Sequence, residues 1–316
     1  MQRKSIAMPG AAERRSFPAL KRYIQHRYYF LMLLPVLAYF LVFHYAPIYG
    51  VLMAFQDYRV FKGISGSEFV GLKHFRELFD GLYFLPVLKN TLIINAYKIV
   101  FGFPAPIILA LLINEVMRPR FKKWVQTISY LPHFLSWIVL SGIIIEMLSP
   151  SRGALNVLLM ELGFQPVYFL ASTDWFRSVL VSTEIWKGVG FSAIIYLAAI
   201  AGISPELYEA AEVDGISRLK KVWYITLPSI APVIVIMIIL NSGSIINDDF
   251  DQIYNLLNTN VLSVGDVIST YTYTEGIAKM NYSYAAAVGL FKNAIALVMV
   301  LTANTIARRF SDQAIF

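Results

Sequence analysis

The sequence predicts an all-α, polytopic membrane protein with six transmembrane helices, from its composition and from the spacing of its apolar runs. Hydrophobic residues make up 57% of the 316 residues, charged residues only 15%, and the mean hydropathy is +0.59. Ordinary soluble domains are about 45–50% apolar and about 25% charged. So few charges cannot keep this much apolar surface dispersed in water. The composition therefore excludes a soluble globular protein, a disordered chain and a nucleic-acid-binding protein.

Six apolar runs are long enough to cross about 30 Å of hydrocarbon as helices. The first run contains Pro35 and Pro47, which can bend it, and no small-residue cleavage site follows a short apolar core. We therefore expect an uncleaved anchor rather than a signal peptide. Two outer segments, 56–85 and 247–283, are long enough to form caps or short helices. The six expected spans are 28–55, 86–113, 124–148, 176–200, 230–246 and 285–306.

Lysine and arginine fall mostly on one side of the membrane in this arrangement. The N-terminal arm, the segments between spans two and three and between spans four and five, and the tail hold 16 of them, against eight on the other side. This bias predicts that both termini are cytoplasmic. We expect a basic cytoplasmic arm over 1–27, a six-span membrane domain over 28–306 and a cytoplasmic tail over 307–316.

Several kinds of chemistry are not predicted for this chain. It has no cysteine, and its four histidines are scattered without helical ligand spacing, so we expect no metal site. It contains no GxxxxGK[ST] sequence, so we expect no nucleotide-binding loop and no cofactor in this chain.

The segment between spans four and five, 204–228, predicts two short helices outside the membrane. Ser204 is expected to be the N-cap, Pro205 the first helical residue, and Gly215 the C-terminal stop. Leu207, Ala210 and Ala211 form a small, weakly apolar face that would let a partner approach closely. A second helix is expected from Arg218 to a break at Pro228.

The same segment contains a spaced motif. Glu209-Ala210-Ala211 is followed after three residues by Gly215, and after nine more by Ile225, with Leu227-Pro228 one residue beyond. This spacing resembles the EAA signature of binding-protein-dependent ABC importer permeases. The segments 103–112, 130–134 and 196–200 resemble the carbohydrate-uptake branch, and Phe250-Asp251-Gln252-Ile253-Tyr254-Asn255 resembles its LplB-like oligosaccharide subgroup, which includes permeases for pectin- or alginate-derived oligosaccharides.

The resemblance implies the type I ABC importer permease fold and a transport subunit without chemistry of its own. Such a permease lies in the cytoplasmic (inner) membrane of a bacterium and pairs with a second permease, commonly as a heterodimer. Two separate ATPase subunits bind ATP and Mg, and an extracytoplasmic solute-binding protein delivers a sugar or oligosaccharide. The EAA segment docks on an ATPase as a coupling helix. The residues that this implies for coupling are Glu209, Ala210, Ala211, Asp214 and Gly215.

Polar residues within the spans are candidates for the substrate pathway, because charges at membrane depth cost several kcal/mol unless they are paired or hydrated. Thr91, Asn95, Lys98 and Gly102 share one helical face that should point into the bundle. Three intramembrane lysines suit a carboxylated sugar such as a uronate. A purely structural role, through pairing or snorkelling, stays open for Lys98 and Lys187. The predicted pathway residues are Asn95, Lys98, Lys187, Asn241, Ser244, Asp248 and Lys292.

Two other functions can be compared with the importer. An intramembrane enzyme would need a Ser/His pair, two facing aspartates or an HExxH sequence, and none is apparent. An ion-coupled secondary transporter acting without an ATPase could use Glu146, Glu184 or Lys187, with Glu184 and Lys187 close enough on one helix to pair. That alternative leaves the EAA segment unexplained.

Overall fold

The computed structural model describes residues 26–242 and 248–310, in two compact units, 1–52 and 53–316. The predicted arm 1–27 and tail 307–316 lie largely outside the described residues. In the first unit, α2 (Arg27–Phe40) leads into the π-helical turn η1 (Leu41–Tyr45) and then into the 3-10 helix η2 (Ala46–Phe55). Together they make the apolar helix Tyr28–Phe55, which confirms the predicted first span.

Two prolines in apolar helices follow π-helical turns. Pro47 comes two residues after η1 (Leu41–Tyr45), and Pro228 comes two residues after η4 (Val222–Thr226). A proline ring clashes with the carbonyl four residues earlier in a regular α-helix, and a wider π turn relieves that clash. The helix therefore continues through Pro228, and the break predicted there is wrong. In the described residues the fifth span consists of α12 (Arg218–Lys221), η4 and α13 (Leu227–Ser242), so it begins at Arg218 rather than at 230. The predicted end at 246 lies outside the described residues.

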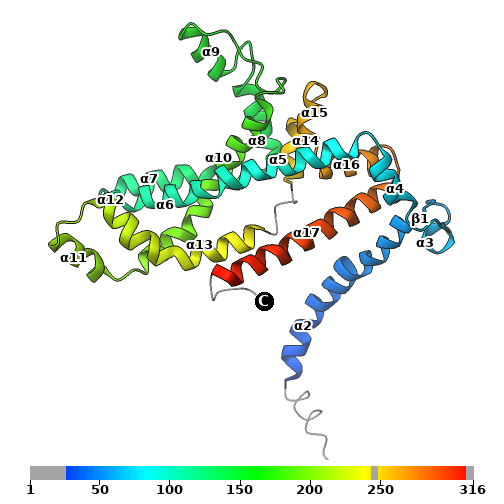
Figure 1. The fold of residues 1–316 in the computed structure, drawn as a ribbon, viewed down its shortest axis with the longest axis horizontal. Helices are drawn as coiled ribbons and strands as arrows, with labels where there is room; N and C mark the ends of the chain where they lie inside the picture. Colours follow the sequence, from blue (N-terminus) through cyan, green and yellow to red (C-terminus); the bar gives the residue numbers. More distant parts are fainter. Residues whose placement is uncertain (1–25, 243–247, 311–316) are drawn as a thin grey trace, which may run out of the picture. The chain divides into compact units, whose positions relative to one another are not determined.

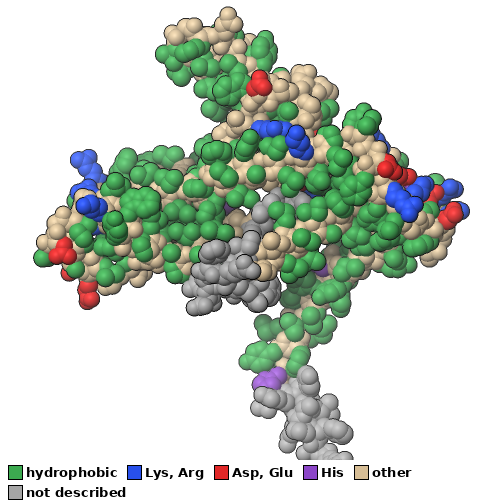
Figure 2. Space-filling model, viewed as in Figure 1, with side chains coloured by type: hydrophobic (Ala, Val, Ile, Leu, Met, Phe, Trp, Pro, Cys, Tyr) green, Lys and Arg blue, Asp and Glu red, His purple; other side chains and the backbone are tan. Residues whose placement is uncertain are grey.

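The other long spans lie close to their predicted limits. The second span consists of α5 (Phe84–Gly102) and α6 (Pro104–Asn114), the fourth is α10 (Phe176–Ala201), and the sixth is α17 (Tyr282–Phe310). Hydrophobic side chains cover much of the visible surface, and most charged ones lie at its left and right edges, with a further Lys and Arg patch near the upper centre (Figure 2). This distribution is that of helices whose middles face lipid.

The third predicted span, 124–148, is not one straight helix. The helix α7 (Pro119–Tyr130) and the 3-10 turn η3 (Leu131–Phe134) are followed by a turn of 108° into α8 (Trp137–Met147). Pro132 lies in the turn, Leu135 and Ser136 are extended, and Ser136 caps α8 by accepting the Val139 N–H group. Within the described residues five helices are long and apolar enough to span, and this bent pair makes six if it counts as one.

The fourth span is the centre of the second unit. The helix α10 packs against α5, α6, α7 and α13 (Figure 1). It approaches α7 closely at Gly190, where an added Cβ would come within 2.1 Å of the Ser129 carbonyl oxygen. Behind this crossing, Ala110, Ala193, Tyr196 and Ile230 form a buried apolar cluster. The close approach fixes α7 beside the helix that carries Glu184 and Lys187.

The outer segments fold into short elements, as expected. Between the first and second spans lie the two-residue strands β1 (Gln56–Asp57) and β2 (Glu68–Phe69), with α3 (Gly63–Gly66) between them and α4 (Lys73–Asp80) after them. Before the sixth span lie α14 (Phe250–Leu256), η5 (Thr259–Val261), α15 (Leu262–Gly265), α16 (Ile268–Tyr273) and η6 (Thr274–Ala278). The helix α9 (Ala154–Glu161) follows α8, and α11 (Pro205–Val213) connects α10 to α12.

Candidate functional site

The part of the segment 204–228 that carries the EAA spacing begins with the helix α11 (Pro205–Val213), which has the predicted start and stop. Ser204 is the N-cap, although its side chain makes no capping hydrogen bond, and Pro205 is the first helical residue. Gly215 has a φ of +71°. The Ile216 N–H group donates to the Ala211 carbonyl (2.9 Å) and the Gly215 N–H group to the Glu212 carbonyl (3.1 Å). These two bonds form a Schellman motif, which requires the left-handed residue that glycine supplies.

Two side-chain contacts tie α11 to the start of the fifth span. The Tyr208 hydroxyl lies 2.9 Å from the Thr226 hydroxyl, and Lys221 Nζ lies 2.7 Å from Glu212 Oε1. The hydrogen bond from Lys221 holds the pKa of the Glu212 carboxyl below its usual range. Because Thr226 lies in the π turn η4, these contacts join α11 to the helix that continues into α13.

The exposed face of α11 differs from the predicted one. Glu209, Ala210 and Asp214 are exposed, together with Val213 at 89%, so they can meet a partner. Ala211 is only 4% exposed because it faces this chain itself, so its assignment to the partner-facing surface is wrong. The structure therefore leaves Ala210 as the small residue on the free face.

A cavity of about 250 Å³ lies among α5, α6, α10 and α13 in the middle of the second unit. Three of the predicted pathway residues, Asn95, Lys98 and Asn241, line it together with Gly102. The prediction that the polar face of span two points into the bundle is therefore confirmed. Ser192 and Tyr196 of α10 also line the cavity; no feature of the sequence distinguished Ser192, and Tyr196 stood out only as the first residue of the segment 196–200.

Lys98 and Glu184, which both line this cavity, form an ion pair. Lys98 Nζ also donates to Gln252 Oε1 (2.9 Å), and Gln252 Nε2 donates to the Leu180 carbonyl (2.7 Å) and to Thr183 Oγ1 (2.9 Å). Gln252 is fully buried. A single glutamine thus joins α5, α10 and α14, and the sequence drew attention to it only as part of the run 250–255.

The three-residue spacing of Glu184 and Lys187 suggested that they pair, but Lys187 makes a different contact. Its ammonium group lies over the Trp137 ring, 4.6 Å from the ring centroid, a cation–π contact. The Trp137 ring nitrogen donates to the Asp249 carboxylate. Glu184 instead pairs across the bundle with Lys98, which leaves Lys187 beside an aromatic ring rather than beside a carboxylate in the described structure.

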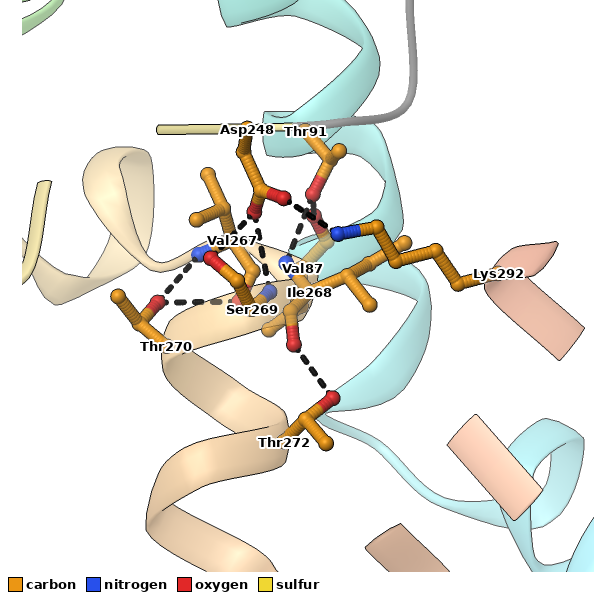
Figure 3. A network of polar contacts seen from close by, with 9 residues as sticks. All are labelled: Val87, Thr91, Asp248, Val267, Ile268, Ser269, Thr270, Thr272 and Lys292. Atoms are coloured by element: carbon orange, nitrogen blue, oxygen red, sulfur yellow. Dashed lines mark hydrogen bonds and ion pairs between the residues drawn. The ribbon is translucent and has the colours of Figure 1, made fainter. Parts of the chain in front are cut away.

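Asp248 and Lys292 are joined at the start of α16 (Figure 3). Lys292 Nζ lies 2.8 Å from Asp248 Oδ1, and Asp248 Oδ2 accepts the Ser269 N–H group (3.0 Å) and the Ser269 hydroxyl (2.8 Å). Thr91 Oγ1 accepts the Ile268 N–H group at 2.9 Å. The Asp248 side chain is fully buried and that of Lys292 is 17% exposed. Nearby, burial raises the pKa of the Asp266 carboxyl.

The seven predicted pathway residues therefore separate into groups. Asn95, Lys98 and Asn241 share the cavity, Lys187 lies over Trp137, and Asp248 pairs with Lys292. Ser244 lies outside the described residues. Helical spacing would place Asn241, Ser244, Asp248 and Asp251 on one face, but this face does not continue to Asp251, because Asp248 and Asp249 are not helical and Asp249 is the extended N-cap of α14.

The chain is similar in sequence and fold to several known transport proteins. A protein from Bacillus subtilis (strain 168), the polygalacturonan/rhamnogalacturonan transport system permease protein YteP, is 45% identical over 94% of this chain and 92% of its own. Protein LplB of the same organism is 42% identical over 94% and 93%. A crystal structure of a bacterial ABC transporter involved in import of the acidic polysaccharide alginate contains a chain with 41% identity and a TM-score of 0.86, covering 93% of this chain and 99% of that one.

The model of one protein family matches residues 102–312, which include the coupling segment and most of the membrane cavity. With the TM-score of 0.86, this match gives the chain the type I ABC importer permease fold that the EAA spacing implied. None of these likenesses supports a secondary transporter acting without an ATPase. The chain belongs to the family of binding-protein-dependent transport system inner membrane components.

Proposed function

We propose that this chain is the permease subunit of an ATP-driven bacterial importer, and that its substrate is an acidic oligosaccharide of the uronate type. The single observation that carries the substrate class is the set of three lysines within the spans, one of which, Lys187, lies against an aromatic ring instead of a carboxylate. The polygalacturonan and alginate systems among the similar proteins support the same class.

The cavity has the groups needed to bind sugar oxygens. Asn95 is 3% exposed, and its Nδ2 atom has no hydrogen-bond partner in the described structure. Leaving a buried donor without a partner costs about 1–3 kcal/mol. A hydroxyl or carboxylate oxygen in the cavity would accept from it, next to the ammonium group of Lys98. The substrate would then pass between α5, α10 and α13.

Movement of the substrate is expected to be driven through α11. The exposed residues Glu209, Ala210, Val213 and Asp214 would dock on an ATPase subunit that binds ATP and Mg. The ties of Tyr208 to Thr226 and of Glu212 to Lys221 would pass its displacement to the fifth span. Alternation between inward- and outward-open states then follows from ATP binding to two such subunits.

The remaining partners follow from this assembly. We expect a second permease chain as the heterodimeric partner, two ATPase subunits and an extracytoplasmic solute-binding protein, in the inner membrane with both termini cytoplasmic. A known alginate transporter was crystallised with its alginate pentasaccharide-bound periplasmic protein, which supports the binding-protein partner. Purification of this chain from native membranes in mild detergent tests the assembly, because recovery without an ATPase would contradict it.

Lys187 tests the acidic substrate class. Lys187→Gln removes the charge over Trp137 and should reduce ATP-dependent uptake of trigalacturonate about tenfold, since a hydrogen bond to a charged group is worth about 1.5–3 kcal/mol. Uptake of the trigalacturonate methyl ester, which has the same backbone without charge, should change much less. Lys89→Gln, at an exposed lysine of α5, is the matched control. Equal loss for both sugars would contradict the proposed role.

A further inference from the structure

A second recess lies beside α17, separate from the cavity among α5, α10 and α13. It has a volume of about 620 Å³, and its walls come from α14, α16, η6 and α17. Pockets that bind small molecules usually measure about 300–1,000 Å³. The recess is therefore large enough for a ligand.

One wall of the recess is aromatic. Phe250 and Tyr273 line it, with ring centroids 5.2 Å apart, and Tyr254 stacks on Phe250 at 5.0 Å with an interplanar angle of 19°. Tyr254 and Tyr273 are 44% and 37% exposed. Aromatic faces carry negative charge density, so the C–H groups of a pyranose ring pack favourably against them. We call Phe250, Tyr254 and Tyr273 the aromatic ledge.

The opposite wall carries a cation. Lys292 lines the recess ten residues after Tyr282, the first residue of α17, which places it about 15 Å along the helix. A lysine this far into a span must face protein or water rather than lipid. In this chain Lys292 faces Asp248, so the recess has a buried ion pair at its edge.

The side of the recess formed by α17 is lined by small residues, which leave space for a ligand. Ala285, Ala286 and Gly289 of α17 line it, and a Cβ added at Gly289 would meet no atom within 4 Å. The space over Gly289 is thus free for a ligand between the aromatic ledge and Lys292.

We propose that this recess is a subsite for one carboxylated sugar unit, which stacks on the aromatic ledge and places its carboxylate on Lys292. Asp248 holds Lys292 before the sugar arrives and is left with the two hydrogen bonds from Ser269 when the lysine turns to the ligand. A neutral sugar has no charge with which to compete for the lysine. The choice of an acidic sugar rests on the proposed function.

Two substitutions with opposite expected effects test whether Lys292 moves from Asp248 to the sugar carboxylate. Binding of trigalacturonate and of its methyl ester would be measured by calorimetry on the complete transporter in nanodiscs. Lys292→Gln should weaken binding of the acid about tenfold and leave the ester unchanged, as expected for the loss of one charged hydrogen bond. Asp248→Asn should strengthen binding of the acid, because Lys292 is then no longer shared. If both substitutions weaken acid and ester equally, the pair is structural and the proposal is overturned.

Further variants keep the test decisive if Lys292→Gln fails to assemble. The double variant Asp248→Asn with Lys292→Gln leaves no buried unpaired charge and should lose the preference for the acid. Gly289→Leu fills the recess and should weaken both sugars, whereas Lys279→Gln, at an exposed lysine paired with Glu275, should weaken neither.

The subsite and the proposed function fail in different ways. A wild-type complex that transports neutral oligosaccharides but neither binds nor transports trigalacturonate contradicts the substrate class, and the subsite with it. A wild-type complex that transports trigalacturonate, with Gly289→Leu and the double variant binding it normally, overturns the subsite alone.

Discussion

Substitution of Gly215 tests whether the end of the coupling helix depends on its left-handed residue. Its φ is +71°, and an added Cβ would meet no atom within 4 Å. Gly215→Ala therefore introduces no clash, and its cost is the conformational penalty alone, about 1–2 kcal/mol. That penalty opposes the two hydrogen bonds from Gly215 and Ile216 that close α11.

The size of this penalty sets the expected measurement. A cost of about 1–2 kcal/mol corresponds to about a five- to thirtyfold shift in a local equilibrium. Amide hydrogen exchange in peptides covering 204–228 should accelerate by this factor in Gly215→Ala, and less in Gly215→Asn, because asparagine tolerates the left-handed region better. Transport per ATP hydrolysed should fall in the same order. Exchange equal to the wild type in both variants would refute the argument.

The remaining predictions concern docking, helix packing and pH. Glu209→Lys should abolish uptake at unchanged membrane levels of the complex, and normal uptake would remove Glu209 from the coupling role. Gly190→Ala should lower the melting temperature of the purified complex, because its Cβ would overlap the backbone of α7, whereas Gly188→Ala, with no atom within 4 Å, should not. The hydrogen bond from Lys221 lowers the pKa of Glu212, so the contact is present above the ordinary value of 4.5 and is lost as the pH falls through the lowered value. Protection of the amides in 204–228, measured against their intrinsic exchange rates at each pH, should then fall only in acid, and a fall in protection near neutral pH would contradict this.

Hydropathy predicts the limits of the spans well, but it does not predict where a span bends. The limits of the second and fourth spans differ from the predicted ones by two residues or fewer, because the length of an apolar run reflects the hydrocarbon that it must cross. The turn of 108° before α8 leaves the apolar run unbroken, so hydropathy cannot reveal it. The turn is made by the extended backbone at Leu135 and Ser136. Pro132, three residues earlier, does not predict it, because many helices tolerate a proline.

The positions of candidate functional residues could be predicted where they depend only on neighbouring residues in the sequence. The stop at Gly215 follows from helix-capping chemistry, and the inward face of Asn95 and Lys98 follows from helical spacing. The partner of Glu184 could not be predicted, because Lys98 and Lys187 are both plausible and only the fold brings Lys98 and Gln252 beside it. The burial of Ala211 could not be predicted, because Ala210 and Ala211 are the same residue type on one short helix and only the fold shows which of them is covered.

The central claim is that this chain conducts a carboxylated oligosaccharide when ATP is hydrolysed by its partners. Its most direct test is uptake of radiolabelled trigalacturonate by proteoliposomes that contain the complete transporter and its binding protein, compared with uptake of the methyl ester. We predict uptake of the acid that requires ATP hydrolysis and exceeds uptake of the ester. Uptake that continues without ATP under an ion gradient, or that favours the ester, would contradict the claim.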